Sequence, residues 1–344
     1  MNAQINERKV KWNNFMSGAG NVESMVMISY MEGLENKPFV TDGCYKQNSD
    51  WIVKKYNLMR ENMSWLPDDS IPYLDMLTGT EIFAEAFGCK VVYPQANNPF
   101  ALHKISNVSE ISRLKTPNLW ETRLADLFEM VHQLRSRTEK EAVVRLPDIQ
   151  SPLDIAALIM KKEEFYMGIV DEPEAIRELI AMTYDLLTQF LDEWFKAFGR
   201  EFIAHYPDYY MEYGITLSED EVGIVSASTF IDMFLKELNE LSDRYGRIGI
   251  HCCANSRHQW DNIRKINNLC LLNVAQPEEI VKEAYTFFKD TCGQIHSFYG
   301  EGEIDTWGGQ LPEGARIVFQ LPANNREDAL YKADALKRLR FTGR

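Results

Sequence analysis

The stretch RIGIHCCANSRHQW, residues 247–260, brings His251, Cys252, Cys253 and His258 close together along the chain. A short apolar run precedes the first histidine, which is typical of a buried β-strand. Successive side chains of a strand point to opposite faces, so His251 and Cys253 share one face while Cys252 points to the other. Imidazole nitrogen and thiolate sulfur are preferred zinc ligands, and the pair therefore predicts two ligands of a zinc site.

A catalytic zinc ion takes three protein ligands and keeps one position open. The third ligand must come from elsewhere in the chain, and the acidic run SEDE offers Glu219, Asp220 and Glu221. Asp75 and His296 are further candidates. Buried histidine and cysteine are also common as structural residues, and His258 is best interpreted as a surface or capping residue, so a site without metal stays open at this point.

Composition excludes several classes of function. The chain has 344 residues, a formal net charge of -14 and no basic cluster, which disfavours binding to nucleic acids and to anionic membranes. The N-terminus lacks an apolar signal core and no run of 18 apolar residues occurs, so a cytoplasmic protein is expected. Six cysteines spread over a chain of this length indicate free thiols rather than a disulfide framework.

Short β-type runs alternate with longer amphipathic segments, and this order predicts parallel strands joined by helical crossovers. Helices are expected over residues 172–199 and 277–290, and a decorating hairpin over residues 88–105. We expect one α/β domain over residues 1–344, a (β/α)8 barrel with an N-terminal helical extension; a doubly wound open sheet is the alternative. The predicted strands are 37–41, 70–75, 142–148, 214–218, 247–253, 268–275, 294–300 and 316–322.

Polar side chains follow several of these predicted strands. In a (β/α)8 barrel the chemistry lies at the carboxyl ends of the strands, where the loops meet. That rule selects Asp75, Asp148, Gln150, the run Glu219–Glu221, and the pair His251 and Cys253. Asp75, Glu219 and Asp220 are the predicted catalytic residues, although capping and solvated loop charge are equally good explanations of such carboxylates. Cys270 and Cys292, in contrast, fall at the amino ends of their strands.

With these residues in place, the chain resembles the uroporphyrinogen decarboxylase superfamily over nearly its whole length. The stretches that carry the likeness are WLPDDSIPYLDMLTGTEIFAEAFGCKV, EAVVRLPDIQSPLDIAALIM, SEDEVGIVSASTFIDMFLKELNEL and GIHCCAN. The last of these resembles the H-x-C-G-N strand end of the zinc-dependent methyltransferases in that superfamily. The resemblance implies a (β/α)8 barrel, in agreement with the pattern of strands.

The chain departs from the true decarboxylases. Their arginine-bearing segment after the first strand is replaced by TDGCYKQN, and no arginine occurs between Arg8 and Arg60, so the clamp for a polycarboxylate substrate is missing. Of their site residues only the strand-end aspartate has a clear match, in Asp75. The late cysteine of the coenzyme M methyltransferases is also absent, because the corresponding stretch here is FQLPANN. A carboxylate, predicted as Glu221, would then complete the ligand set of His251 and Cys253.

The resemblance implies a zinc-dependent transfer of a methyl group between a small molecule, such as a methoxyarene, a methylamine or a thiol, and a corrinoid. No D-x-H-x-x-G motif occurs, so the corrinoid would be carried by a partner protein. Tyr210 in the aromatic stretch HYPDYYMEY, together with Gln150 and Asn324, is predicted to bind substrate. The alternatives are a metal-free lyase acting on a small carboxylic acid, and a barrel that binds a ligand without catalysis.

Overall fold

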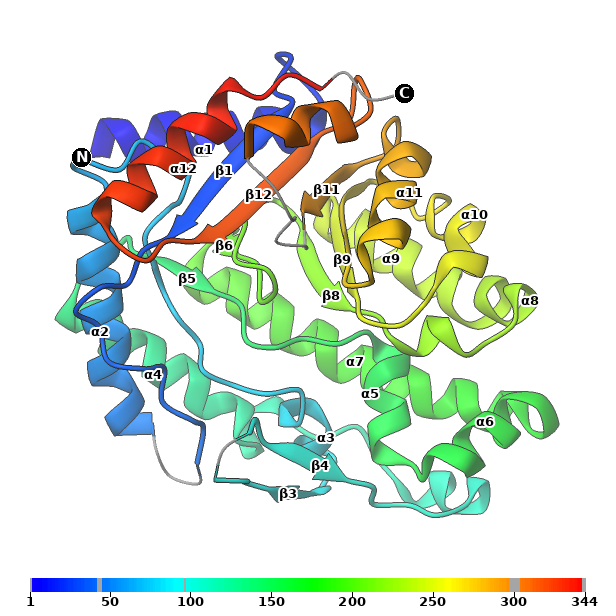
Figure 1. The fold of residues 1–344 in the computed structure, drawn as a ribbon. Coiled ribbons are helices and arrows are strands. Elements are labelled where there is room, and N and C mark those ends of the chain that lie inside the picture. Colours follow the sequence, from blue (N-terminus) through cyan, green and yellow to red (C-terminus); the bar gives the residue numbers. More distant parts are fainter. Residues whose placement is uncertain (1, 42–44, 96, 297–303, 342–344) are drawn as a thin grey trace. The chain divides into compact units, whose positions relative to one another are not determined.

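The computed structural model describes residues 2–41, 45–95, 97–296 and 304–341. The chain forms two compact units, each of which combines helices with strands (Figure 1). Unit 1 contains Met1–Leu34, Lys54–Tyr73 and Tyr206–Arg344, and unit 2 contains Glu35–Val53 and Leu74–His205. Helix α2 (Tyr45–Asn62) and strand β2 (Tyr73–Leu74) pass from one unit to the other.

Unit 1 is built on a six-stranded sheet in the order β1-β12-β11-β10-β9-β8, and all neighbouring strands in it run parallel. The strands are apolar and almost wholly buried, as expected of a parallel sheet whose connections are helices. The other elements of this unit are α1 (Asn2–Ser17), β1 (Ser24–Ser29), β7 (Tyr210–Glu212), β8 (Ile215–Ser218), η3 (Glu221–Gly223), α8 (Ala227–Thr229), the π-helix η4 (Phe230–Leu235), α9 (Lys236–Tyr245), β9 (Ile248–Cys252), η5 (Arg257–Gln259), α10 (Trp260–Ile263), β10 (Leu269–Val274), α11 (Glu278–Phe288), β11 (Gly293–His296), η6 (Ile304–Gln310), β12 (Ile317–Pro322) and α12 (Arg326–Arg338).

Helix α12 lies along β1 and β12 (Figure 1). Its apolar side chains, including Ala333 and Leu336, join β1, β12, α11 and η6 in one buried cluster. The helix begins where the Asn325 side chain accepts a hydrogen bond from the Asp328 backbone N–H, a typical N-cap. Helix α12 therefore covers β1 and β12 at one edge of the sheet.

The N-terminal helix α1 packs at the amino ends of the strands. It ends at Ser17, and Gly18 follows with a φ of 69°, a left-handed conformation that glycine adopts without strain. Phe15 lies so close to Gly293, the first residue of β11, that a Cβ there would be 2.7 Å from its ring. Arg316, which precedes β12, donates a hydrogen bond to the Phe15 carbonyl. The amino ends of β11 and β12 are thus covered by α1, whereas the predicted site lies at the carboxyl end of β9.

Unit 2 contains the parallel pair β5 and β6, the antiparallel hairpin of β3 and β4, and a set of helices. Its longest helix, α7, is amphipathic and ends before Gly199, which has a φ of 90°. Helix α5 begins with Ser151, whose hydroxyl accepts from the Asp154 N–H, followed by Pro152 in the first turn. The elements are α3 (Ile82–Ala86), β3 (Lys90–Val92), β4 (Phe100–Leu102), η1 (Val108–Arg113), η2 (Leu119–Glu121), α4 (Leu124–Arg137), β5 (Val143–Arg145), α5 (Pro152–Ile159), α6 (Lys162–Asp171), α7 (Pro173–Phe198) and β6 (Glu201–Ile203).

The structure confirms an α/β protein with a mostly parallel central sheet, the N-terminal helix, the hairpin at residues 88–105 and the two predicted helices. The strand predicted at residues 37–41 is wrong: Pro38 cannot donate to a ladder, and Phe39 is 49% exposed. The first strand is instead β1, whose Met-rich sequence SMVMIS lacks a strong β signal. The short strands β6 and β7 were also not predicted. Residues 297–300 of the seventh predicted strand lie outside the described residues.

No described helix combines the length and the apolar character needed to span a membrane. Several of them, including α7, α9 and α11, are amphipathic, with buried residues on one face. In α7, for example, Leu179, Leu187 and Phe190 are buried, while Glu178 and Asp192 on the same helix are exposed. Such a helix buries one stripe against the rest of its unit.

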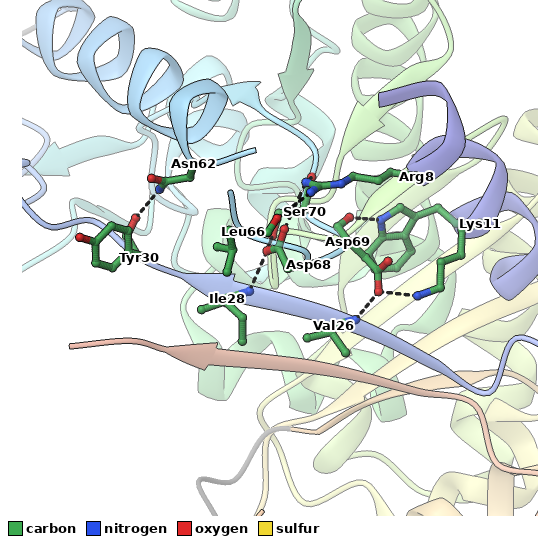
Figure 2. A network of polar contacts seen from close by, with 11 residues as sticks. Arg8, Lys11, Val26, Ile28, Tyr30, Asn62, Leu66, Asp68, Asp69 and Ser70 are labelled. Atoms are coloured by element: carbon green, nitrogen blue, oxygen red, sulfur yellow. Dashed lines mark hydrogen bonds and ion pairs between the residues drawn. The ribbon is translucent and has the colours of Figure 1, made fainter. Parts of the chain in front are cut away.

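Two consecutive carboxylates hold β1 in place (Figure 2). Asp69 accepts hydrogen bonds from the Val26 N–H at 2.8 Å and from Lys11 Nζ at 2.6 Å. Asp68 accepts from the Ile28 N–H at 3.0 Å and forms an ion pair with Arg8 at 3.1 Å. Burial raises the pKa of Asp68, and the Arg8 charge opposes that effect. Two alternate backbone N–H groups of β1 thus donate to carboxylates that also bind Arg8 and Lys11 of α1.

We expect Asp69→Ala to lower the free energy of unfolding by about 2–4 kcal/mol, because the buried N–H of Val26 loses its acceptor and Lys11 its partner. Urea unfolding followed by fluorescence measures the change. Lys11→Ala is the matched control: its side chain is 34% exposed, so its loss should cost no more than about 1 kcal/mol. Equal losses in the two variants would contradict the role given to the Val26 hydrogen bond.

Candidate active site at the carboxyl end of strand β9

Strand β9 carries the histidine and cysteine pair at its end. His251 belongs to the strand and Cys253 follows it directly. The His251 Nε2 atom lies 3.1 Å from Cys253 Sγ, as the alternation of a strand predicts. Cys252 is buried and its thiol donates to the Ala254 carbonyl at 3.5 Å, whereas Cys253 is exposed. The two candidate ligands therefore share one face at the strand end.

The His251 ring is oriented by Asn273 on the neighbouring strand β10. The two residues are paired in the parallel register, and His251 Nδ1 lies 2.5 Å from Asn273 Oδ1. With Nδ1–H donating to the amide oxygen, Nε2 keeps its lone pair for Cys253 or for a ligand. Burial lowers the pKa of His251, although the Asn273 hydrogen bond and the Asp220 charge oppose that shift. The ring of Tyr206 packs edge-on at 4.5 Å between centroids.

Asn273 was not among the residues selected from the sequence. The sequence does mark Asn273, because it is the single polar residue in the apolar run LCLLNV and no neighbouring side chain in that run explains a buried amide. Asn273 is 1% exposed, so its amide must find partners inside the protein. The partner is the histidine one strand away, and an orienting acceptor of this kind is typical of a metal-binding or catalytic histidine.

The predicted acidic run lies against the same strand end. Glu219 donates its backbone N–H to the His251 carbonyl at 2.9 Å, and Asp220 Oδ1 accepts from the Cys253 N–H at 2.5 Å. Glu219 and Glu221 are buried. The loop approaches β9 so closely that a Cβ on Gly223 would lie 2.5 Å from the Ala254 Cβ. The run and the pair are thus held together at one end of the sheet, as predicted.

The described residues bring together two donor side chains of the kind that zinc prefers, but not a complete ligand set. His251 and Cys253 have the right donor atoms, the right separation and an oriented imidazole. Within the described ranges, however, no three His, Cys, Asp or Glu side chains are arranged to hold a metal ion. The assignment of Glu221 as third ligand therefore stays a prediction.

His296, the other histidine considered as a ligand, ends β11 and lies deep among aromatic rings. Its ring stacks on Trp307 at 4.8 Å and its Nδ1 is 3.1 Å from the Tyr285 hydroxyl. Burial lowers the pKa of His296 to about 3, which keeps the imidazole neutral. His258 is exposed, as expected of a surface or capping residue, and its Nε2 atom lies 3.1 Å from the Val225 carbonyl oxygen.

The cysteines that the structure describes form no disulfide, as expected. These cysteines are Cys89, Cys252, Cys253, Cys270 and Cys292, and Cys44 lies outside the described residues. Cys270 and Cys292 are buried at the amino ends of β10 and β11, as predicted. Burial raises the pKa of the Cys270 thiol to about 12, so this sulfur behaves as an apolar residue.

Unit 2 holds a separate group of polar strand-end residues. Asp75 follows β2 and forms an ion pair with Arg145, the last residue of β5, at 2.8 Å. Arg145 also donates to the carbonyls of Ala204, at 3.3 Å, and His205. Asp148 lies 3.9 Å from the buried His205 ring. Sequence reasoning selected Asp75 but missed Arg145, because an arginine inside a buried strand has no local motif.

Glu81, which lies just before α3 in unit 2, was also not predicted from the sequence. The residue is 3% exposed, and its Oε2 atom has no hydrogen-bond partner among the described residues. Burial raises the pKa of Glu81 to about 7, the backbone N–H groups of Glu81 and Gly79 oppose the shift, and the charges of Asp148 and Glu85 add to it. A buried, imperfectly bonded carboxyl of this kind is often part of a functional site.

The three predicted substrate-binding residues differ in their surroundings. Tyr210, in β7 of unit 1, is 1% exposed and lies 5.8 Å from Lys9 Nζ, measured to the ring centroid. Asn324, also in unit 1, is exposed, and its backbone N–H donates to Asp328 at 2.8 Å. Gln150 belongs to unit 2 and has a buried side-chain oxygen without a hydrogen-bond partner among the described residues. Their role in substrate binding stays a prediction.

The buried carboxyl of Glu81 should make the stability of the protein depend on pH. Because its folded-state pKa of about 7 is above the ordinary 4.5, its contribution is fully present below pH 4.5 and is lost as pH rises through 7. Between pH 5.5 and 8.5 this amounts to about 2 kcal/mol. Glu81→Gln should therefore gain about 2 kcal/mol relative to wild type over this range in urea unfolding. Glu163→Gln, an exposed control in α6, should gain nothing.

Comparisons with known proteins agree with this architecture. Residues 61–292 match the family described as Uroporphyrinogen decarboxylase (URO-D), which is more than half of the chain. The chain is similar to a solved structure, a methyltransferase from Methanosarcina mazei, with a TM-score of 0.67 and 11% sequence identity. That similarity covers 96% of this chain and 97% of the other, and at such identity it shows the fold alone. None of the curated proteins matches the chain.

Proposed function

Because this chain belongs to the uroporphyrinogen decarboxylase family, we propose that it is an enzyme that transfers a methyl group between a small molecule and a corrinoid carried by a partner protein. The observation that carries the proposal is the pair of His251 and Cys253 at the end of β9, 3.1 Å apart and oriented by Asn273. The proposal includes closure of the strands into the (β/α)8 barrel that is usual in this family.

In this proposal His251 and Cys253 hold a zinc ion, and a carboxylate of the acidic run, predicted as Glu221, completes its protein ligands. When bound, zinc supplies a Lewis acid that stabilises negative charge on a leaving oxygen, nitrogen or sulfur atom. Asn273 fixes the imidazole so that Nε2 points to the ligand position. The contact of Asp220 with the Cys253 N–H keeps the cysteine at the strand end.

The reaction balances without a further reactant. In the direction that consumes the small molecule, the bond between the methyl carbon and the donor atom would break, and a reduced corrinoid on the partner protein would supply the electron pair for its new bond to the methyl group. The leaving group keeps the electron pair of the broken bond and takes up one proton. Asp75, Glu219 and Asp220 are the predicted acid or base residues for that proton. Tyr210, Gln150 and Asn324 are the predicted contacts for the remainder of the substrate.

A metal-free lyase acting on a small carboxylic acid is the second candidate. The ion pair of Arg145 with Asp75 favours it, because it places a guanidinium at a strand end of unit 2, where a carboxylate substrate would need one. Against the third candidate, a barrel without catalysis, stands the exposure of Cys253: a purely structural pair would have both side chains in the core.

Zinc content and methyl transfer separate these candidates. Wild-type protein purified without chelators should contain close to one zinc per chain by mass spectrometry. His251→Ala and Cys253→Ser should each lower zinc affinity more than about tenfold and methyl transfer more than about a hundredfold. Activity is measured by the absorbance change of a reduced corrinoid offered with methoxyarenes, methylamines or methylated thiols.

Cys252→Ala is the matched control, since its thiol is one residue from the ligands and points away from them. It should keep both zinc and activity. A wild-type protein without zinc would contradict the proposal and favour the lyase. A screen of small carboxylic acids for release of carbon dioxide would then test for lyase activity.

The third ligand can be assigned within the acidic run. Glu219→Gln, Asp220→Asn and Glu221→Gln remove one charge each while preserving shape. We expect Glu221→Gln to weaken zinc binding about tenfold or more and the other two substitutions to change it less. Competition with a chromogenic chelator measures the affinity. Equal affinity in all three variants would place the third ligand elsewhere.

A further inference from the structure

The aromatic stretch HYPDYYMEY brings one tyrosine ring to the candidate site. Tyr206 packs edge-on against His251, with 4.5 Å between the ring centroids, and the residue is 53% exposed. Tyr209 and Tyr210 of the same stretch are each 1% exposed, so their rings belong to the core. The ring that borders the histidine is therefore an accessible one, and a molecule bound beside His251 and Cys253 would meet it.

Tyr206 lies on a segment that is anchored within unit 1. Two residues later, the Asp208 carboxylate accepts a hydrogen bond from the Tyr73 hydroxyl at 2.7 Å, and that hydroxyl accepts one from Lys55 Nζ at 2.7 Å. Lys55 and Tyr73 are buried, and hydrogen bonds to charged groups are strong ones. The Tyr206 ring is thus in place beside the histidine before a ligand arrives, so a contact with it costs little ordering entropy.

The charges near this ring select against one kind of ligand. Asp220 accepts a hydrogen bond from the Cys253 N–H at 2.5 Å, and its charge acts on His251. Glu219 and Glu221 are its neighbours in the acidic run. If one of these carboxylates binds zinc, two others stay beside the site, and a ligand with a carboxylate of its own would meet like charges. A neutral ligand avoids that repulsion.

We propose that Tyr206 is a specificity-determining residue that contacts the methyl donor, and that this donor is a neutral methoxyarene. The arene would pack against the Tyr206 ring, offset or edge-on, with its methoxy group toward His251 and Cys253. Of the donor classes considered above, a methoxyarene necessarily carries a ring for this contact, and its ether oxygen is a leaving atom that a Lewis acid stabilises. The inference rests on the proposed methyl transfer and adds Tyr206 to the predicted substrate contacts.

Calorimetric titration of the full chain tests this contact without a corrinoid. 2-Methoxyphenol should bind saturably, with or without added zinc. 2-Methoxycyclohexanol, which has the same substituents on a ring that is not aromatic, should bind at least about fivefold more weakly. 4-Hydroxy-3-methoxybenzoate, which adds one carboxylate to 2-methoxyphenol, should bind at least about tenfold more weakly, and this difference should shrink as the salt concentration rises.

Tyr206→Ala should remove the preference for 2-methoxyphenol over 2-methoxycyclohexanol and leave the zinc content unchanged, because Tyr206 supplies a ring and no metal ligand. Tyr206→Phe keeps the ring and should bind 2-methoxyphenol within about twofold of wild type. Tyr331→Ala is the matched control: Tyr331 is 45% exposed on α12, and its loss should leave both affinities unchanged. A structural role of Tyr206 alone would not change the ratio of the two affinities.

A wild-type protein that binds none of the three compounds, or that does not prefer 2-methoxyphenol over the other two, would overturn this inference. These measurements use wild type alone, so they do not depend on the folding of a variant. Failure of the proposed function is a separate result, namely wild type without zinc and without methyl transfer to a corrinoid. Zinc together with methyl transfer from amines or thiols, but no preference for the arene, would support the proposed function and contradict the role of Tyr206.

Discussion

The parallel register of strands β8, β9 and β10 is the constraint on which the candidate site depends. It pairs Ser218 with His251 and His251 with Asn273, so three polar residues form one row across three strands. In a parallel sheet this row lies near the carboxyl ends, where side chains leave the core and loops begin. A slip of one residue in β10 would put Asn273 on the opposite face and Val274 or Leu272 beside the histidine.

The buried carboxylates Asp68 and Asp69 hold strand β1 and helix α1 of the same unit in place. A charged group inside a protein is tolerated when hydrogen bonds and an opposite charge replace water. These two residues meet that requirement with backbone N–H groups of β1 and with Arg8 and Lys11 of α1. The result is that α1 stays at the amino ends of strands and leaves the carboxyl ends available for chemistry.

Unit 2 contains one buried carboxyl that is paired in this way and one that is not. Asp75 is paired with Arg145, whereas Glu81 has two like charges near it and an oxygen with no donor in the part of the chain that the structure describes. The first arrangement satisfies its groups within the protein. The second raises the pKa of the Glu81 carboxyl to about 7, so the group is partly protonated at neutral pH. Burying its charged form costs stability, and such groups are often found at functional sites.

The sequence alone determined the features that depend on neighbours along the chain. Alternation within β9 placed His251 and Cys253 on one face, and helical periodicity located α7 and α11. The predictions failed where the state of a segment depends on distant packing. Strand β1 forms because it pairs with β12 and packs against α12. Residues 37–41 contain β-favouring types but form no strand.

Only the tertiary structure decided which partners meet. Asn273 lies beside His251, and Arg145 lies beside Asp75, through contacts between elements far apart in sequence. The Oε2 atom of Glu81 has no hydrogen-bond partner among the described residues. Local pattern cannot give such pairs, because strand register and loop approach are set by the packing of the whole core.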